Sequence, residues 1–230
     1  DPFAQEFEVP PKHSSIVSRC DDSSKPKNKR FVWSDSEWLL KRKRKGVPGV
    51  KKGPMAIYEV HLPSFMRGGD GRILNYRELA PRLVNHCSSM NFNYVELLPL
   101  AQHPFDGSWG YQVTGQYGVY SALGSPDDFK FFVDALHNAG IGVIMDFVPA
   151  HFVKDSWGLA YYDGGPTFEY ADTRLGEHKG WGTLVYDFSK MEVRSFLIGA
   201  ALFWIERYHL DGLRVDAVSA MVYRNYCREV

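Results

Sequence analysis

The stretch Asp211-Gly-Leu-Arg-Val-Asp-Ala-Val218 decides the fold class of this chain. It predicts a short apolar strand, and side chains two residues apart in a strand leave the same face. Arg214 and Asp216 therefore emerge together near the end of a buried strand. A carboxylate beside an arginine stays ionised and keeps its orientation, which suits a nucleophile. A structural ion pair at a strand end is the alternative, and this stretch alone leaves both open.

An apolar strand followed by a helix occurs three times before this stretch. We predict strands at 55–61, 93–99, 141–148 and 211–217, and helices at 75–91, from 125 to about 139, and from 189 onward. Near-continuous apolar strands are typical of parallel sheets covered on both faces. Two α/β architectures fit this order, a doubly wound open sheet and half of a (β/α)₈ barrel.

Polar residues and long loops gather at the carboxyl ends of these strands. The polar residues are His61, Asp146, Arg214 and Asp216, and the long loops span 100–124 and 149–188. Both features are typical of the active face of a barrel. No glycine-rich phosphate loop follows a strand, which disfavours nucleotide binding. We therefore expect an α/β fold that is the first half of a (β/α)₈ TIM barrel.

The helix within 75–91 contains a proline, which is a poor interior helix residue. We expect the regular helix to begin at Pro81, with that proline in its first turn. Leu83, Cys87 and Met90 then share the face that packs on the sheet.

The next two helices carry their own start signals. Ser125 is the expected N-cap of the first, with Pro126 at its first position and Gly140 at its end. Ser189 and Glu192 predict a capping box for the second. The predicted core residues of these helices are Phe129, Phe132, Val133 and Leu136, and then Val193, Phe196, Leu197, Ala200 and Trp204.

Residues 1–52 differ in composition from the rest and are assigned to a separate region. Glu6 to Val9 predicts the end of a strand and Asp35 to Leu40 one helical turn, with a basic linker around them. The runs at 25–30 and 41–45 also suit nucleic-acid binding, but no aromatic residues alternate with them. Residues 53–230 are assigned to the barrel, and the chain is expected to be an internal piece of a longer protein.

Composition narrows the function classes. Lys+Arg and Asp+Glu are both 27, so no net charge favours nucleic acid or a membrane surface. No apolar run is long enough to span a membrane. Cys20, Cys87 and Cys227 form neither a disulfide framework nor a metal-ligand spacing, which favours a reducing, cytoplasmic compartment. We expect no cofactor and no metal site.

Two loops carry the other candidate site residues. Asp146 and His151 lie on either side of a strand-to-loop turn, so both can reach one pocket. There they suit hydrogen bonding to hydroxyl groups. The alternative is a structural role, in which His151 only caps the loop. Trp109 and Tyr111 lie in a glycine-rich loop at 103–117. Sugar rings present apolar faces that stack on such side chains, although these aromatics also suit anchoring of the loop to the core.

At this point several ordered motifs resemble the α-amylase superfamily, glycoside hydrolase family 13, and more narrowly the glycogen (1,4-α-glucan) branching enzymes. The motifs are Tyr58-Glu-Val-His61, His103-Pro-Phe-Asp-Gly-Ser-Trp-Gly-Tyr111, Asp146-Phe-Val-Pro-Ala-His151 and Gly212-Leu-Arg-Val-Asp-Ala217. The resemblance covers nearly the whole chain. Asp1 to Ala4 resemble the end of the β-sandwich that precedes the barrel in that family, and 5–52 the connecting segment.

The resemblance implies roles for these residues. Asp216 matches the nucleophile that forms a β-glucosyl-enzyme intermediate, and Arg214 its orienting partner. Tyr111 matches the platform for the sugar at the cleavage subsite. His151 matches a donor to that sugar's hydroxyls, and Asp146 a carboxylate that supports the site. Trp109 lies in the same aromatic loop and is a candidate for substrate stacking.

Two departures from the superfamily pattern matter. A retaining enzyme needs a second carboxyl group as acid/base. In the family this group comes from a later strand. Glu59 and Glu96 do not replace it, because both lie inside predicted strands. Ala150 stands where many α-amylases have a calcium-binding Asn, which argues against that calcium site.

The expected function is transfer of α-1,4-glucan segments to a 6-hydroxyl, forming α-1,6 branches, in a parent protein with the remaining half of the barrel. Residues 1–230 alone are expected to be inactive. A glucan-binding fragment without catalysis is one alternative. Another α-amylase-superfamily hydrolase, such as a trehalose-forming enzyme, is the other.

Overall fold

The computed structural model describes residues 1–17, 31–45 and 54–223, with side chains through residue 43 in the second range. The strands are β1 Glu6–Phe7, β2 Ser15–Ile16, β3 Ile57–Val60, β4 Tyr94–Leu97, β5 Ala101–Gln102, β6 Gly115–Val119, β7 Gly142–Phe147, β8 His151–Phe152, β9 Glu177–His178, β10 Thr183–Val185 and β11 Gly212–Val215. The α-helices are α1 Ser36–Lys45, α2 Leu62–Phe65, α3 Tyr76–Met90, α4 Pro126–Asn138, α5 Thr173–Gly176, α6 Met191–Arg207 and α7 Val218–Val222. Cys20, Cys227 and the basic run 25–30 lie outside the described residues.

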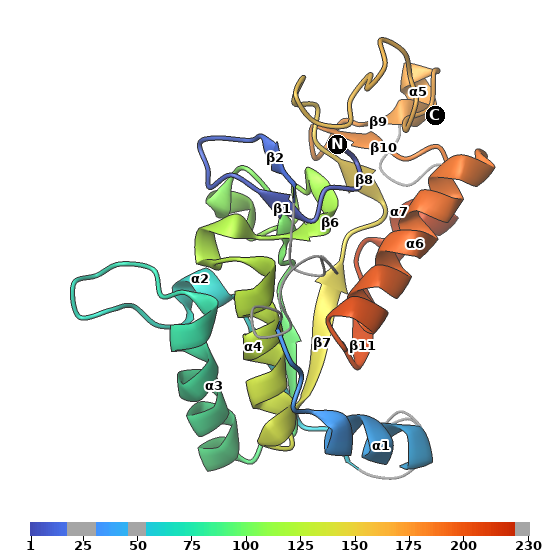
Figure 1. The fold of residues 1–230 in the computed structure, drawn as a ribbon. Helices are drawn as coiled ribbons and strands as arrows, with labels where there is room; N and C mark the ends of the chain where they lie inside the picture. The colour runs from blue at the N-terminus through green and yellow to red at the C-terminus, as the bar shows by residue number, and fades with distance from the viewer. Residues whose placement is uncertain (18–30, 46–53, 224–230) are drawn as a thin grey trace.

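The central sheet has four parallel strands in the order β11-β7-β4-β3. Along the chain, each new strand of this sheet is added beside the sheet's previous strand, whereas the strand order of a doubly wound sheet reverses at a switch point. Figure 1 shows α3 and α4 side by side along one flank, and α6 packs against β6. This arrangement is that of a segment of a (β/α) barrel.

The register of the sheet sorts its side chains onto two faces. Glu59, Glu96, Ile144 and Gly212 are level with one another across the four strands, and two residues further along β7 and β11 Asp146 pairs with Arg214. Because side chains alternate, these residues share one face. The other face is apolar and packs beneath the helices, with Val60, Leu97 and Met145 buried. The polar face therefore leads directly to the strand ends where the candidate site lies.

Helix α3 starts earlier than the proline predicts. Asn75 accepts from the backbone N–H of Glu78, whose side chain accepts from Asn75 N–H, and this capping box starts the helix at Tyr76. Pro81 lies inside the helix, so the expected start there is wrong. The helix continues through the proline although its missing N–H removes one backbone hydrogen bond. Met90 is also wrong as a core residue, since it is 60% exposed at the helix end.

The predicted cores of α4 and α6 are confirmed, but one cap is not. Ser125 caps α4 as expected, and every predicted core residue of both helices is buried. The N-cap of α6 is Lys190, without a side-chain bond, and Ser189 instead donates to Asp187 Oδ1 at 2.5 Å. The capping box predicted for Ser189 and Glu192 is therefore wrong, because a nearer carboxylate binds the hydroxyl.

The described parts of residues 1–52 contain secondary structure that packs on the rest of the molecule. β1 and β2 form a small antiparallel pair, and Phe7 lies against Gly115 and Gly118 of β6, where added Cβ atoms would meet its ring at 2.6 and 2.4 Å. The predicted single turn after Asp35 is a helix of ten residues, α1. Its side chains bind the start of β11, as described below. None of the helices within the described ranges has the length and apolar character of a membrane span.

Candidate active site

The ends of β7 and β11 bring three charged side chains together. Arg214 Nη1 donates to Asp216 Oδ1 at 2.7 Å and to Asp146 Oδ2 at 3.3 Å. Arg214 and Asp146 are register partners in adjacent parallel strands, so the backbone itself holds them level. One guanidinium thus joins two carboxylates, and the same-face prediction for Arg214 and Asp216 is confirmed.

A tight loop places Tyr111 on this group. Tyr111 Oη donates to Asp146 Oδ2 at 2.6 Å, across 35 residues of sequence. The preceding Gly110 has φ +92°, and a Cβ there would lie 2.1 Å from the carbonyl oxygen of Pro99. Only glycine permits both the positive φ and this close approach. Gly110 therefore allows the loop to pass close to Pro99, and this path brings Tyr111 within hydrogen-bond distance of Asp146 on β7.

Burial and charge act against each other at Asp146. Its side chain is 3% exposed, and burial raises its pKa to about 6, although Tyr111 and Arg214 oppose the rise. Asp216, with 20% of its side chain exposed, is the more accessible carboxylate. At pH 7 Asp146 is mainly ionised and buried, whereas Asp216 keeps an accessible oxygen, which suits a support and a nucleophile respectively.

His151 lies close enough to Asp216 for the charge of that carboxylate to affect its pKa. It begins β8 and is buried, and burial lowers its pKa to about 4 while the charge of Asp216 opposes the shift. At neutral pH it is a neutral imidazole, which donates one hydrogen bond and accepts another. Its Nδ1 has no hydrogen-bond partner among the described residues. A neutral donor and acceptor beside an anionic pair suits recognition of hydroxyl groups.

Trp109 stands apart from the hydrogen-bonded group. It is 59% exposed, has φ +56°, and its ring centroid lies 6.1 Å from that of His61 at the end of β3. No described contact joins it to Asp216. The structure therefore joins Tyr111, Asp146, Arg214 and Asp216 by hydrogen bonds, adds His151 through its charge interaction, and leaves Trp109 at the edge.

Three further residues contribute that the sequence motifs did not single out as part of the site. Glu96 shares the polar face with Asp146 and raises its pKa. Trp181 lies 5.0 Å from the ring of His151 and stacks on His178 at 3.7 Å. Strand alternation carries a signal for Glu96, since Ile144 and Asp146 on the next strand share its face. The approach of Trp181 depends on the path of the long loop after β7 and has no sequence signal.

Within the described residues, no group of three His, Cys, Asp or Glu side chains is arranged to hold a metal ion. Cys87 is a buried free thiol. The carboxylates of the site are instead held by a guanidinium and a phenol.

The fold and the site define a class of protein, namely a segment of an α-amylase-type barrel. A solved structure from Salmonella typhimurium, of a protein provisionally assigned as an α-amylase, matches with a TM-score of 0.72 at 26% sequence identity. The match covers 97% of this chain and 33% of that one. No family model matches the chain.

Curated relatives narrow this class further. The 1,4-α-glucan branching enzyme GlgB of Gloeobacter violaceus is 52% identical over 99% of this chain, and that of Methylococcus capsulatus is 48% identical over 100%. The chain spans about 30% of the length of each. The chain is thus a homologue of the 1,4-α-glucan branching enzymes, which confirms the resemblance of its motifs.

Proposed function

We propose that the protein containing this chain is a 1,4-α-glucan branching enzyme of glycogen biosynthesis. It cuts an α-1,4-glucan and transfers the segment to a glucan 6-hydroxyl, forming an α-1,6 branch. The observation that carries this proposal is Arg214, which joins Asp216 to Asp146 beneath Tyr111 at the strand ends. The homology to GlgB proteins supports it.

In the first chemical step, the Asp216 carboxylate attacks the anomeric carbon. A C1–O bond to the carboxylate forms as the bond from C1 to the glycosidic oxygen breaks, and the leaving oxygen takes a proton from an acid. In the second step a 6-hydroxyl attacks C1, releases the carboxylate and returns its proton to the same group. Two inversions at one carbon retain the α configuration.

The proton donor of this scheme is assigned to the part of the barrel outside this chain. Asp146 shares Arg214 with Asp216, but its side chain is 3% exposed and its Oδ2 already accepts from Tyr111 and Arg214. A retaining acid/base faces the leaving oxygen about 5 Å from the nucleophile. Asp146 therefore supports the site, and residues 1–230 alone are expected to be inactive.

The remaining roles follow from the geometry. Arg214 orients Asp216 through its hydrogen bond to Oδ1, and the ring of Tyr111 offers a flat face beside the attacked carbon. His151, which is neutral at pH 7, and Trp109 suit contact with sugar hydroxyls and with an outer sugar ring respectively. No cofactor is needed for this chemistry.

We assign residues 53–230 to the N-terminal half of the (β/α)₈ barrel, whose partner is the remaining half. Residues 1–52 are assigned to the end of a preceding β-sandwich and a connecting segment. The paired small strands β1 and β2 lie within the part assigned to the connecting segment. The free thiol of Cys87 supports a reducing, cytoplasmic compartment.

The proposed function is tested with amylose as substrate. The intact protein should lower the absorbance of iodine-stained amylose and produce new α-1,6 signals by NMR. Loss of iodine staining with reducing ends but no α-1,6 signals would instead identify a hydrolase.

Glucan binding through the 103–117 loop is expected to depend on Tyr111. Replacing it by Ala removes the flat ring, and affinity for maltoheptaose measured by calorimetry should fall by at least about tenfold. Tyr162→Ala is the matched control, because Tyr162 is 47% exposed in a different loop. Equal affinity of the wild type and Tyr111→Ala would remove Tyr111 from the site.

The raised pKa of Asp146 predicts an acid limb in the activity. As pH falls through about 6, Asp146 protonates and its charge contact with Arg214 is lost, so the branching rate should decline. Tyr111→Phe removes a donor that lowers this pKa, and the limb should then move to higher pH. Rates of both proteins measured from about pH 5 to 8 test this; an unmoved limb would assign it to another group.

The same shift has a defined sign for stability. The folded state favours protonated Asp146 more than the unfolded state does. Asp146 therefore reduces stability at neutral pH, and this cost is relieved as pH falls from about 6 toward the ordinary value.

A further inference from the structure

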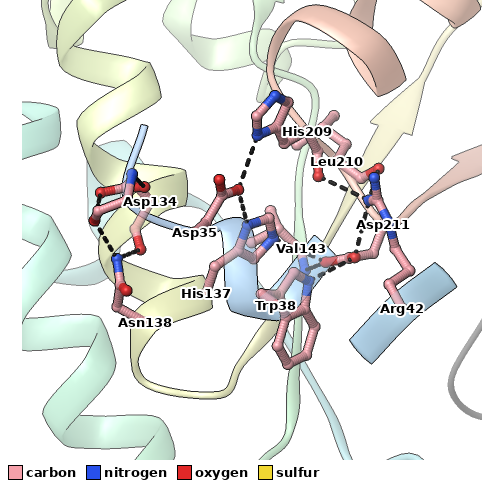
Figure 2. Close-up of polar contacts among 11 residues, drawn as sticks. Asp35, Trp38, Arg42, Asp134, His137, Asn138, Val143, His209, Leu210 and Asp211 are labelled. Carbon is pink, nitrogen blue, oxygen red and sulfur yellow. Dashed lines mark hydrogen bonds and ion pairs between the residues drawn. The ribbon is translucent and has the colours of Figure 1, made fainter. Parts of the chain in front are cut away.

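A buried ionic cluster lies where β7 and β11 begin (Figure 2), whereas the candidate active site lies where the same two strands end. Its members come from four separate parts of the chain: the segment before α1, α1 itself, the end of α4, and the turn from α6 into β11. They are Asp35, Trp38, Arg42, His137, His209 and Asp211. None of them contributes to the chemistry described above.

His137 is the centre of this cluster. Its side chain is fully buried, with Nδ1 2.8 Å from Asp35 Oδ2 and Nε2 3.0 Å from Asp211 Oδ2. Both ring nitrogens thus face carboxylate oxygens. An ionised carboxylate only accepts hydrogen bonds, so two such partners require an N–H on each nitrogen.

Asp211 is held ionised by four donors. Besides His137, it accepts from the backbone N–H of Val143 at 2.8 Å, from Trp38 Nε1 at 2.9 Å and from Arg42 Nη1 at 3.1 Å. A protonated carboxyl group would have to turn its own O–H toward one of these donors. Burial alone raises the pKa of Asp211, but the hydrogen bonds and the charge of His137 bring it below its ordinary value.

Asp35 completes the arrangement. Its Oδ2 accepts from His137 and lies 2.8 Å from Nδ1 of His209. Burial raises the pKa of Asp35, and its two histidine partners reverse that shift to a net lowering. Burial lowers the pKa of His137, and its bonds to Asp211 and Asp35 reverse that shift to a net rise.

We propose that His137 is an imidazolium clamped between Asp35 and Asp211, and that this clamp fixes the register of β11. The clamp is therefore a positioning element for Arg214 and Asp216, a consequence that rests on the roles proposed for them above. His137 touches no reacting group and acts only through the strand.

The connection from the clamp to the strand is direct. Asp211 donates its backbone N–H to the carbonyl of Val143 at 2.8 Å, and the N–H of Val143 returns to Asp211 Oδ2. This two-bond ring sets Gly212 beside Ile144 and so Arg214 beside Asp146. A slip of one residue would move Arg214 and Asp216 to the helix-covered face.

Helix α1 also anchors the turn before β11. Arg42 Nη1 donates to the carbonyls of His209 and Leu210, both at 3.0 Å. His209 has φ +56°, a left-handed conformation that costs a non-glycine residue energy, and its ring stacks on Trp33 with centroids 3.8 Å apart. α1 thus holds a turn that would otherwise relax.

The segment before α1 is fastened to α4 on its other side. Ser34 donates its N–H and hydroxyl to Asp134, and Asn138 donates to Ser34 Oγ. Tyr94 of β4 also faces the cluster, since the charges of Asp211 and Arg42 act on it; burial raises its pKa to about 12, so it stays neutral. The titratable and charged groups around His137 are therefore Asp35, Asp211, Arg42, His209, Tyr94 and, one turn away on α4, Asp134.

The clamp has a defined pH window. Since the folded pKa of His137 is raised, its stabilisation is complete below its ordinary value of about 6.5 and is lost as pH rises through the folded value. Since the pKa values of Asp35 and Asp211 are lowered, their stabilisation is complete above about 3.9 and is lost as pH falls through their folded values.

The protonation state of His137 is tested on the intact protein by exchange of its imidazole C2 hydrogen, followed by mass spectrometry over pH. We expect its transition to lie above about 6.5. A transition below that value means that His137 is neutral and that Asp35 carries the proton, which would overturn the clamp.

The effect on β11 is tested by amide hydrogen exchange of residues 211–216. His137→Gln leaves a buried carboxylate without its charged partner, so these amides should exchange at least about tenfold faster than in the wild type. Trp38→Phe, which keeps an aromatic ring but removes the indole N–H that donates to Asp211, should give a smaller increase in the same amides. Glu37→Gln on the exposed face of α1 is the control and should change nothing.

A pH series separates positioning by charge from general packing. In the wild type, protection of 211–216 should fall at the pH where His137 loses its proton, and in Trp38→Phe it should fall at the same transition. Protection that ignores this transition, or that is unchanged in both variants, contradicts the proposal. If the exchange results hold but Asp216→Asn retains activity, the catalytic assignment fails and the clamp stands.

Discussion

Replacing Asp216 by Asn in the intact protein is expected to reduce branching of amylose by at least about 10⁴-fold. The amide keeps the shape of the side chain and still accepts from Arg214, but it cannot form the glycosyl ester. Asp146 still accepts hydrogen bonds from Arg214 and Tyr111, so the local structure should persist. The assay is the loss of iodine absorbance combined with α-1,6 signals by NMR.

Glu206→Gln provides the matched control for this change. It replaces a carboxylate by an amide on the exposed face of α6, away from the strand ends. Activity equal to the wild type is expected, with unchanged circular dichroism in both variants. Full activity in Asp216→Asn would show that the nucleophile is another residue.

Trp204→Ala is expected to reduce the free energy of unfolding by about 3–5 kcal/mol. The side chain is fully buried, and its ring packs on Phe129 and Tyr208, with centroids 5.9 and 5.0 Å away. Its Nε1 donates to the carbonyl of Gln116 at 2.8 Å, so truncation also leaves a buried acceptor unpaired.

The measurement is urea unfolding followed by circular dichroism. Leu202→Ala in the same helix is the control, because Leu202 is 51% exposed and its truncation should cost no more than about 0.5 kcal/mol. Equal unfolding midpoints for Trp204→Ala and the wild type would mean that Trp204 does not pack against α4 and β6 as described.

Alternation and periodicity predicted much of the fold from the sequence. The two-residue spacing of Arg214 and Asp216 was enough to place them on one face, and the stripe from Phe129 to Leu136 was enough to define the buried side of α4. These signals are local, since strand pleat and helix pitch fix them within a few residues.

Other features depend on competition that a local pattern does not show. Ser189 has the spacing of a cap, but Asp187 lies nearer and takes its hydroxyl. Pro81 signals a helix start, but the capping box at Asn75 outweighs one missing backbone bond.

Long-range contacts were the least predictable feature, both in the candidate site and in the cluster around His137. Tyr111 reaches Asp146 only because Gly110 lets the chain pass against Pro99. Trp38 meets Asp211 across 173 residues, through the packing of α1 on the sheet. The basic composition of α1 predicted a linker and gave no sign that Trp38 binds Asp211. Neither this contact nor that of Tyr111 with Asp146 follows from residue spacing.

The most direct test of the central claim is to trap the glycosyl-enzyme intermediate. The intact protein is incubated with a fluorinated glucosyl fluoride, which forms the ester quickly and releases it slowly, and its peptides are analysed by mass spectrometry. The proposed mechanism predicts that the carboxylate displaces the anomeric fluoride, which leaves one added fluoroglucosyl unit on the peptide that carries Asp216, and none in Asp216→Asn. A glucosyl unit on Asp146, or an active protein that accumulates no adduct, would contradict it.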